Sequence, residues 1–242
     1  MKLNKKFALG SIAAAVMAMA GTVANAATFQ SMLEYSAVGA FGGNMTSNTL
    51  PYFGMVTLTE GGSGTGAYVD VGVTLTSGFR FIDTGNTGQH TSFAFNLSNP
   101  GAASLTGINP SPPWYLNAVN PTSNSPFGTF TTGLDCCASN GAPGVLGPLS
   151  FRVQSTNGLT FGGSGDHFVS NSDGTLGSLN GGWWFVADLV GPDGSSTGMV
   201  AARDLVPAAP IPEPETYAML LAGLGLLGFA ARRRKQKKVA AA

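Results

Sequence analysis

Positive charge is nearly absent from the middle of this 242-residue chain. Between Ala27 and Ala209 there is no lysine, and three arginines stand against ten acidic residues, which leaves a formal charge near −7. Binding nucleic acid requires clustered cations that displace counterions, so this balance excludes a nucleic-acid partner. Divalent cations, and polymers that carry them, are compatible with it, and so is a charge that serves solubility alone.

Common catalytic motifs are scarce as well. The chain has no H-E-x-x-H zinc motif and no phosphate-cradling loop with its lysine. We therefore expect a protein that is not an enzyme and that has no obligatory cofactor. One alternative stays open, because a glycosidase uses two carboxylates that the fold alone brings together.

The N-terminus has the features of a targeting segment. A basic start at residues 1–6 precedes an apolar run at residues 7–23, and Ala24 and Ala26 occupy the small-residue positions of a cleavage site. This pattern predicts a signal peptide over residues 1–26, read by the export machinery and removed by signal peptidase. The alternative is a retained N-terminal anchor.

Period-two alternation predicts strands through residues 27–206. Tyr68–Thr76 alternates polar with apolar side chains, and clusters of Gly, Pro, Asn and Asp separate this run from others like it. No window has a long amphipathic helix pattern. We expect an all-β fold, a single acidic β-sandwich or jelly-roll domain, with a long surface loop at residues 107–126. The other expected strands are Met55–Glu60, Phe79–Asp83, Thr91–Leu97, Phe127–Thr131, Leu149–Gln154, Trp183–Leu189 and Gly198–Ala202.

The C-terminus has three parts in a fixed order. Residues 207–216 are rich in proline and form an extended linker, residues 217–231 are apolar, and residues 232–242 are basic. Fifteen apolar residues rise about 22 Å as a helix, less than the roughly 30 Å of a bilayer core. Such a transmembrane segment suits a transient passage through the inner membrane, with its basic tail on the cytoplasmic side.

This tail resembles the PEP-CTERM sorting signal. The resemblance rests on Pro212-Glu213-Pro214, on the apolar run at residues 220–228, and on Arg232, Arg233 and Arg234. It implies that an exosortase, a membrane-embedded transpeptidase of Gram-negative bacteria that also make exopolysaccharide, processes the chain at the proline motif. The protein would then reach the cell surface or the extracellular matrix. An ordinary C-terminal anchor on a proline-rich stalk is the alternative. Several runs in the middle of the chain are similar to uncharacterised PEP-CTERM proteins, a resemblance that implies no activity.

Aromatic pairs are the candidate sugar-binding residues. Trp114-Tyr115 lies in the expected loop, and alternation along a strand sends Trp183 and Trp184 to opposite faces. We expect one of these tryptophans in the core and the other, Trp184, exposed together with Trp114 and Tyr115. An exposed aromatic ring on a sandwich face can stack on a sugar.

A calcium ion is the candidate metal. Asn171 and Asp173 precede a glycine in an oxygen-rich turn, although the further carboxylates of an EF-hand loop are missing. An Asx-type turn explains the same residues. His167 could join Asp166 or Asp188 around a metal, but a chain with two histidines builds no histidine-rich zinc site.

Cys136 and Cys137 are the two cysteines of the chain, and they are adjacent. In an oxidising compartment they predict a vicinal disulfide, a small strained ring that acts either as a clip on a turn or as a redox switch. Pairing between two molecules is a third alternative. A catalytic thiol would need a base, and the spacing of His90 and His167 places neither beside the cysteines.

The function that follows is an exported, non-enzymatic component of the cell surface or exopolysaccharide matrix. The alternatives are a secreted carbohydrate-binding module, stabilised by calcium in one version, and a polysaccharide-active enzyme.

Overall fold

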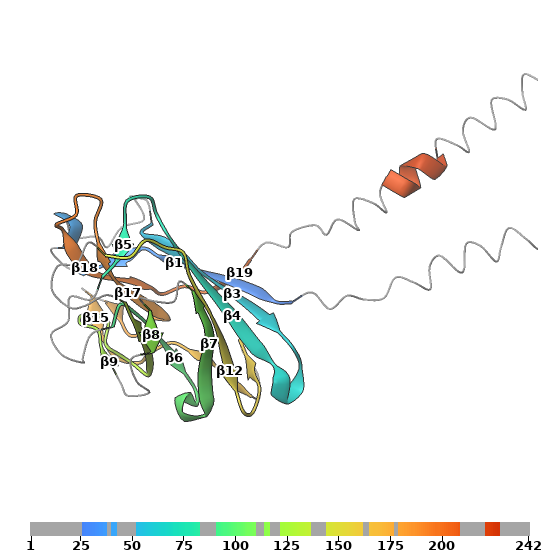
Figure 1. Cartoon of the computed structure of the whole chain (residues 1–242), viewed down its shortest axis with the longest axis horizontal. Helices are drawn as coiled ribbons and strands as arrows, with labels where there is room; N and C mark the ends of the chain where they lie inside the picture. The colour runs from blue at the N-terminus through green and yellow to red at the C-terminus, as the bar shows by residue number, and fades with distance from the viewer. Residues whose placement is uncertain are drawn as a thin grey trace, which may run out of the picture. The chain divides into compact units, whose positions relative to one another are not determined.

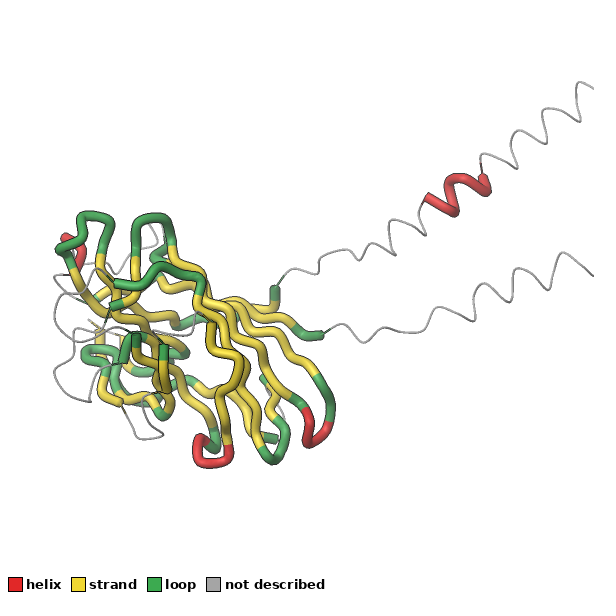
Figure 2. The backbone as a smooth tube through the Cα atoms, in the orientation of Figure 1, coloured by secondary structure: helices red, strands yellow, loops and turns green. Residues whose placement is uncertain are grey.

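The computed structural model describes residues 26–37, 40–42, 52–82, 91–109, 114–116, 122–136, 144–161, 165–176, 179–208 and 221–227. The chain divides into two compact units, residues 1–207 and residues 208–242. Strands dominate the first unit (Figures 1 and 2), which confirms the predicted all-β fold. In the second unit the structure describes a short helix at residues 221–227.

A six-stranded antiparallel sheet forms one layer. Its long strands alternate along their length: in β4, Val69, Val71 and Val73 are buried, while Asp70 and Gly72 are partly exposed. This is the predicted alternation, with one face on the core and the other toward solvent. In spatial order the strands are β19 (Val206–Pro207), β1 (Thr28–Leu33), β3 (Gly54–Gly61), β4 (Tyr68–Leu75), β12 (Leu149–Ser155) and β7 (Ala103–Asn109).

A nine-stranded sheet forms the second layer. Its central strands are buried on both faces, since every residue of β6 and of β17 is buried. The main path runs β13 (Leu159–Thr160), β14 (Asp166–Val169), β6 (Phe93–Leu97), β17 (Phe185–Val190), β18 (Thr197–Ala202) and β2 (Tyr35–Ser36), and β11 (Thr132–Asp135), β8 (Tyr115–Leu116) and β5 (Arg80–Phe81) pair beside it.

The main core lies between these two sheets. Phe151 of the six-stranded sheet packs against Phe93 and Phe95 of the nine-stranded sheet, with ring centroids 6.1 and 5.7 Å apart. Phe185 stacks on Phe93 from the neighbouring strand, at 6.0 Å. Because side chains of both sheets fill one continuous cluster, the two layers form the predicted sandwich.

The opposite face of the nine-stranded sheet is covered by a smaller layer, which we name the cap. The cap consists of two short antiparallel pairs, β9 (Thr122–Ser123) with β10 (Thr129–Phe130), and β15 (Thr175–Leu176) with β16 (Leu179–Asn180). A second core cluster fills the space beneath it, including Phe127, Phe130, Trp183 and Val186. No pattern in the sequence predicts this third layer.

Single-turn 3-10 helices occur at η1 (Ala40–Gly42), η2 (Gly64–Gly66) and η3 (Pro100–Ala102). The last two lie in the glycine- and proline-rich segments that the sequence assigned to turns. The predicted loop over residues 107–126 is wrong in part, because β7 extends to Asn109 and β8 and β9 fall inside it.

The predicted linker also begins inside the sandwich. Pro207 pairs with Phe29 in the edge strand β19, and a proline is tolerated there because an edge strand can lack one ladder donor. Of the predicted membrane segment, the structure describes residues 221–227, and no helix in the described residues is long and apolar enough to cross a membrane.

Candidate functional site: the outer face of the six-stranded sheet

The outer face of the six-stranded sheet carries an ion pair between neighbouring strands. The buried residues of β4, and those of β12 as far as Val153, are apolar, so the alternate residues of both strands point outward. The register sets Arg152 directly opposite Asp70. Across that pair, Arg152 Nε donates to Asp70 Oδ1 at 2.7 Å and Nη2 donates to Oδ2 at 2.9 Å.

The Tyr68 ring packs against the guanidinium of Arg152. The Arg152 Cζ atom lies 3.5 Å from the centroid of the Tyr68 ring, a cation–π contact. The hydrogen bonds that Arg152 donates to Asp70 raise the pKa of Arg152 above its ordinary value, so the group carries its charge at every physiological pH. The side chains remain accessible, with 37% of Arg152 and 46% of Asp70 exposed.

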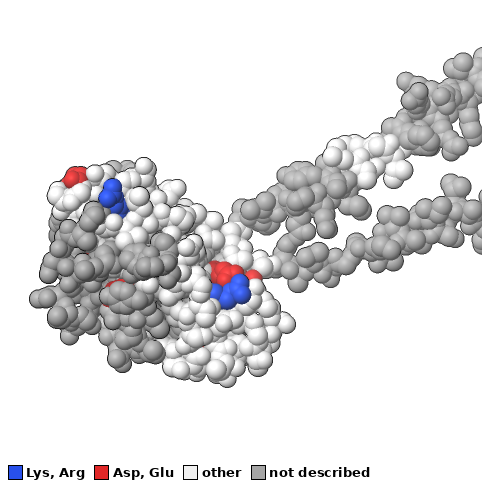
Figure 3. All heavy atoms as spheres, in the orientation of Figure 1, with Lys and Arg blue, Asp and Glu red and all other residues white. Residues whose placement is uncertain are grey.

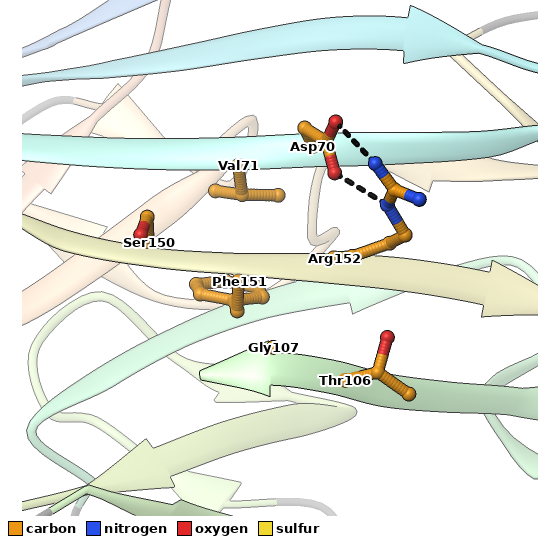
Figure 4. Close-up of a pocket in the computed structure, with 7 residues that line it drawn as sticks. All are labelled: Asp70, Val71, Thr106, Gly107, Ser150, Phe151 and Arg152. Atoms are coloured by element: carbon orange, nitrogen blue, oxygen red, sulfur yellow. Dashed lines mark hydrogen bonds and ion pairs between the residues drawn. The ribbon is translucent and has the colours of Figure 1, made fainter. Parts of the chain in front are cut away.

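A hollow lies beside the ion pair, where the ladder between β12 and β7 is irregular. The register shifts between Ser150 and Arg152, and Gly107 lies opposite this shift with φ of 62°. A glycine in the left-handed region is the usual residue of such a β-bulge, because a side chain is strained there. The hollow has a volume of about 350 Å³ (Figure 4) and is lined by Asp70, Val71, Thr106, Gly107, Ser150, Phe151 and Arg152.

The surroundings of the hollow are polar but uncharged. Thr59 and Thr106 extend the Asp70–Arg152 row onto the strands on either side. Gly72, between Thr57 and Ser150, has open space where a Cβ atom would stand. Figure 3 shows sparse charge on the visible face, with acidic and basic atoms adjoining over the six-stranded sheet. The face can therefore form directed hydrogen bonds without an overall field of one sign.

The predicted sugar platforms lie elsewhere and are less accessible than expected. Trp114 is 4% exposed and packs edge-on against Phe81 at 4.9 Å, so its ring offers no free face to a sugar. Trp184 is half-buried and lies 5.8 Å from the ring of Phe161. The backbone of Tyr115 forms β8, and its side chain lies outside the described residues. Trp183 is fully buried, as expected for one of the pair.

The second unit of the chain has a recognisable sequence. A family model described as the PEP-CTERM protein-sorting motif matches residues 210–235. The chain carries a PEP-CTERM protein-sorting motif. Neither a curated protein nor a solved structure matches the chain.

The PEP-CTERM match begins shortly after β19, where the sandwich ends. It covers Pro212, Glu213 and Pro214 and the arginines Arg232, Arg233 and Arg234, all of which lie outside the described residues. The motif indicates an exosortase-targeted extracellular protein and confirms the resemblance. Ala26 is described just before β1, whereas Ala24 and the rest of the predicted signal peptide lie outside the described residues.

Within the first unit of the chain, the two candidate calcium ligands connect the halves of the cap. Asn171 donates to the Phe127 carbonyl at 2.5 Å and accepts from the Trp183 N–H at 3.0 Å. The Asp173 carboxylate accepts from the Thr129 N–H at 3.0 Å. The side-chain amide of Asn171 is thus engaged by the protein itself. Among the described residues, no group of three His, Cys, Asp or Glu side chains gathers around a common point.

The predicted partners of His167 point elsewhere. The His167 ring lies 2.9 Å from the Gly165 carbonyl, while the preceding Asp166 accepts a hydrogen bond from the Ser155 hydroxyl. His90 and Cys137 lie outside the described residues. Cys136 is buried in the main core and donates its N–H to the Ser92 hydroxyl at 3.1 Å. The vicinal disulfide remains a prediction.

Two buried acidic residues form hydrogen bonds with the backbone of Ser92, Asp135 through its carboxylate and Asp188 through its own backbone N–H. Asp135 accepts from the Ser92 N–H at 3.0 Å, and the Asp188 N–H donates to the Ser92 carbonyl at 3.0 Å. Asp135 is 2% exposed and Asp188 is fully buried. A second pair, Glu34 and Asp204, is more accessible: burial raises the pKa of Glu34, and the charge of Asp204 raises it further.

Sequence reasoning missed the Asp70–Arg152 site because the two residues are 82 positions apart. Alternation correctly predicted that Asp70 points outward from its strand. It gave no information about which strand pairs with β4, or about the bulge that opens the hollow.

Proposed function

We propose that this exported protein has a non-enzymatic, adhesive or structural role at the cell surface or in the exopolysaccharide matrix. After exosortase processing, the released sandwich contacts extracellular polymer. The observation that carries the proposal is the combination of a sorting motif with a sheet face that is open, polar and nearly uncharged.

The non-enzymatic role is consistent with the surroundings of the acidic residues. Asp135 and Asp188 are 2% and 0% exposed, so a polymer substrate has no access to them. The sequence Gly194–Gly198 matches the spacing of a nucleophile elbow, yet it lies in the hairpin between β17 and β18 rather than in a strand-to-helix turn. Its central Ser196 donates to the Asp193 carboxylate.

Sorting is tested by following the tail in strains with and without the exosortase. We expect the full-length chain to accumulate in membranes without the enzyme, and a shortened form to appear outside the cell with it. A variant with Pro212, Glu213 and Pro214 replaced by alanine should stay full-length in both strains. A wild-type chain that keeps its tail in both strains would contradict the sorting role.

The adhesive role needs a separate measurement. We expect the processed protein to co-fractionate with matrix polymer of the producing strain and to be released when that polymer is degraded. Distribution into the soluble medium regardless of polymer would contradict a matrix role.

A secreted carbohydrate-binding module is the second candidate. The observation that favours it is the hollow beside Asp70 and Arg152, because binding sites for small molecules are concave and present a few convergent polar groups. In this version the protein recognises one type of polymer instead of contributing bulk structure.

A further inference from the structure

We infer that the hollow on the six-stranded sheet binds a neutral polysaccharide, and that Asp70 and Arg152 contact adjacent hydroxyl groups of one sugar ring. The inference deepens the proposed contact with extracellular polymer and rests on it for the place where the ligand is met. The evidence comes from the hydrogen-bonding capacity, the charge and the shape of this face.

The ion pair leaves donors and acceptors side by side. A guanidinium has five N–H donors, and Arg152 uses one on Nε and one on Nη2 for Asp70. Tyr68 also forms a hydrogen bond with Arg152. The N–H groups that face neither Asp70 nor Tyr68, and the remaining lone pairs of the carboxylate, are available to a ligand, since both side chains are more than a third exposed. Two adjacent hydroxyl groups match this arrangement, because each can donate to the carboxylate and accept from the guanidinium.

The charge of the pair selects against ionic ligands. Arg152 is neutralised by Asp70 at 2.7 Å, so it offers no surplus positive charge to a uronate or sulfate group. The other lining residues are uncharged, since Thr106 and Ser150 carry hydroxyls, Gly107 has no side chain, and Val71 and Phe151 are apolar. Residues 27–209 as a whole carry a formal charge near −7. An anionic polymer would be repelled by this domain, whereas a neutral polyol would not.

The site is also organised before a ligand arrives. The Tyr68 ring holds the guanidinium at 3.5 Å, and the two hydrogen bonds to Asp70 fix its plane. Holding a long side chain in one geometry reduces the entropy that binding would otherwise lose. Figure 4 shows Thr106 on β7 on the same side of the view as Arg152 and Ser150 further along β12, and both residues line the hollow.

The shape suits a sugar ring lying on a sheet. The register shift at Gly107 leaves the hollow between β7 and β12, and the ring of Phe151, which is 3% exposed, points away from it into the core. On the neighbouring strand, Gly72 lies opposite Ser150 and has no side chain, so nothing projects from the sheet at that position. A polymer can therefore continue past the hollow without meeting a large side chain at that position.

Affinity electrophoresis through gels that contain one polymer at a time tests the inference. The probes are dextran, mannan and galactan as neutral polymers with adjacent free hydroxyls, a linear glucan whose linkage leaves no adjacent hydroxyls within the chain, and alginate as the anionic polymer. The protein is the secreted processed form, or the detergent-solubilised full chain where the tail stays attached. Failure of sorting and failure of binding are thereby measured independently.

Three variants locate the site. The double variant Asp70→Val with Arg152→Met removes the polar groups while keeping side chains that suit a strand. Gly72→Phe adds a ring on the same face, where a Cβ atom has no neighbour within 4 Å. Arg80→Gln, on β5 of the other sheet, removes an exposed arginine as the matched control.

We expect retention by at least one neutral polymer with adjacent hydroxyls, unchanged by salt. The double variant should bind about tenfold or more weakly because charge-assisted hydrogen bonds disappear, and Gly72→Phe should bind about as weakly because its ring obstructs the face. Arg80→Gln should bind like wild type, and the melting temperatures of Gly72→Phe and the double variant should confirm that both are folded.

Several results would overturn the inference. They are no retention by any of the three neutral polymers, equal retention by the glucan without adjacent hydroxyls, retention by alginate alone, or wild-type binding by the double variant. If the tail is processed normally and these results are obtained, the sorting role stands and the binding site does not.

Discussion

The two sheets of the sandwich differ in how many of their faces are covered. Along β4 of the six-stranded sheet, buried valines alternate with Tyr68, Asp70 and Gly72, whereas all six residues of β17 in the nine-stranded sheet are buried. The nine-stranded sheet lies between the main core and the cap, so its polar residues must find partners inside the protein. Asn96 does so by accepting from the Thr131 N–H at 2.7 Å.

This difference indicates where the protein can meet a ligand. Polar residues on the cap side contribute to packing the cap, as Asn171 does two residues after β14 ends. A polar residue on the outer face of the six-stranded sheet does not pack against another layer, so its side chain remains available to a ligand. The comparison therefore predicts that mutations on the two sheets separate stability from binding.

The largest effect is expected in the main core. Phe185→Ala removes a fully buried ring that packs on Phe93 and Phe168, with centroids 6.0 and 6.2 Å away. A cost of about 3–5 kcal/mol is expected from the lost contacts and the cavity. Urea unfolding measures it, with Thr59→Ala on the outer face as the control, expected to change stability by less than about 0.5 kcal/mol. Equal effects at the two positions would break the comparison.

A glycine on the nine-stranded sheet comes next. A Cβ atom on Gly133 of β11 would lie 2.4 Å from Thr91 Cγ2, and both Gly133 and Thr91 are buried. Gly133→Ala should therefore destabilise the protein by roughly 1–3 kcal/mol through overpacking. A shift of the urea midpoint at constant slope measures this cost. An unchanged midpoint would mean that the cap side is less tightly packed than the structure indicates.

The same substitution on the six-stranded sheet should have the opposite sign. Gly72 occupies a strand interior with no atom within 4 Å of its added Cβ, so Gly72→Ala loses no packing. Removing the conformational freedom of glycine in the unfolded chain should stabilise the protein by roughly 0.5 kcal/mol. Gly72→Ala and Gly133→Ala form a matched pair, and destabilisation by both would remove the distinction between the two sheets.

The smallest effect is expected at the rim of the nine-stranded sheet, in the turn between β17 and β18. Asp193 accepts from the N–H groups of Ser195 and Ser196 at 3.0 and 2.9 Å and from the Ser196 hydroxyl. These bonds, the one from the Ser196 hydroxyl above all, lower the pKa of Asp193 well below its ordinary value of 3.8.

A lowered folded-state pKa means that the ionised Asp193 stabilises the fold at pH values above 3.8, and that this stability is lost as the pH falls through the lower folded value. Asp193→Asn should melt slightly below wild type at neutral pH, and the two curves should converge in acid. Thermal melts across this range measure the difference, and a gap that widens on acidification would contradict the assignment.

The sequence by itself determined the all-β class, the sorting motif and the inward or outward direction of residues in the regular strands. Each of these depends on neighbours in the chain: the two-residue period of a strand, or an ordered run of prolines, apolar residues and arginines. The alternation predicts that Val69 and Val71 are buried while Asp70 points outward. It also predicts that Trp183 and Trp184 lie on opposite faces of their strand.

Only the tertiary structure decided which residues come together. The register between β4 and β12 places Asp70 opposite Arg152, and the bulge at Gly107 opens the hollow beside them. Asn171, a calcium ligand in the sequence-based prediction, forms a hydrogen bond with the cap instead. Trp114 has the composition of a surface loop around it, yet it lies in the core against Phe81. Strand pairing and burial depend on contacts between distant segments, and no local pattern of residues encodes those contacts.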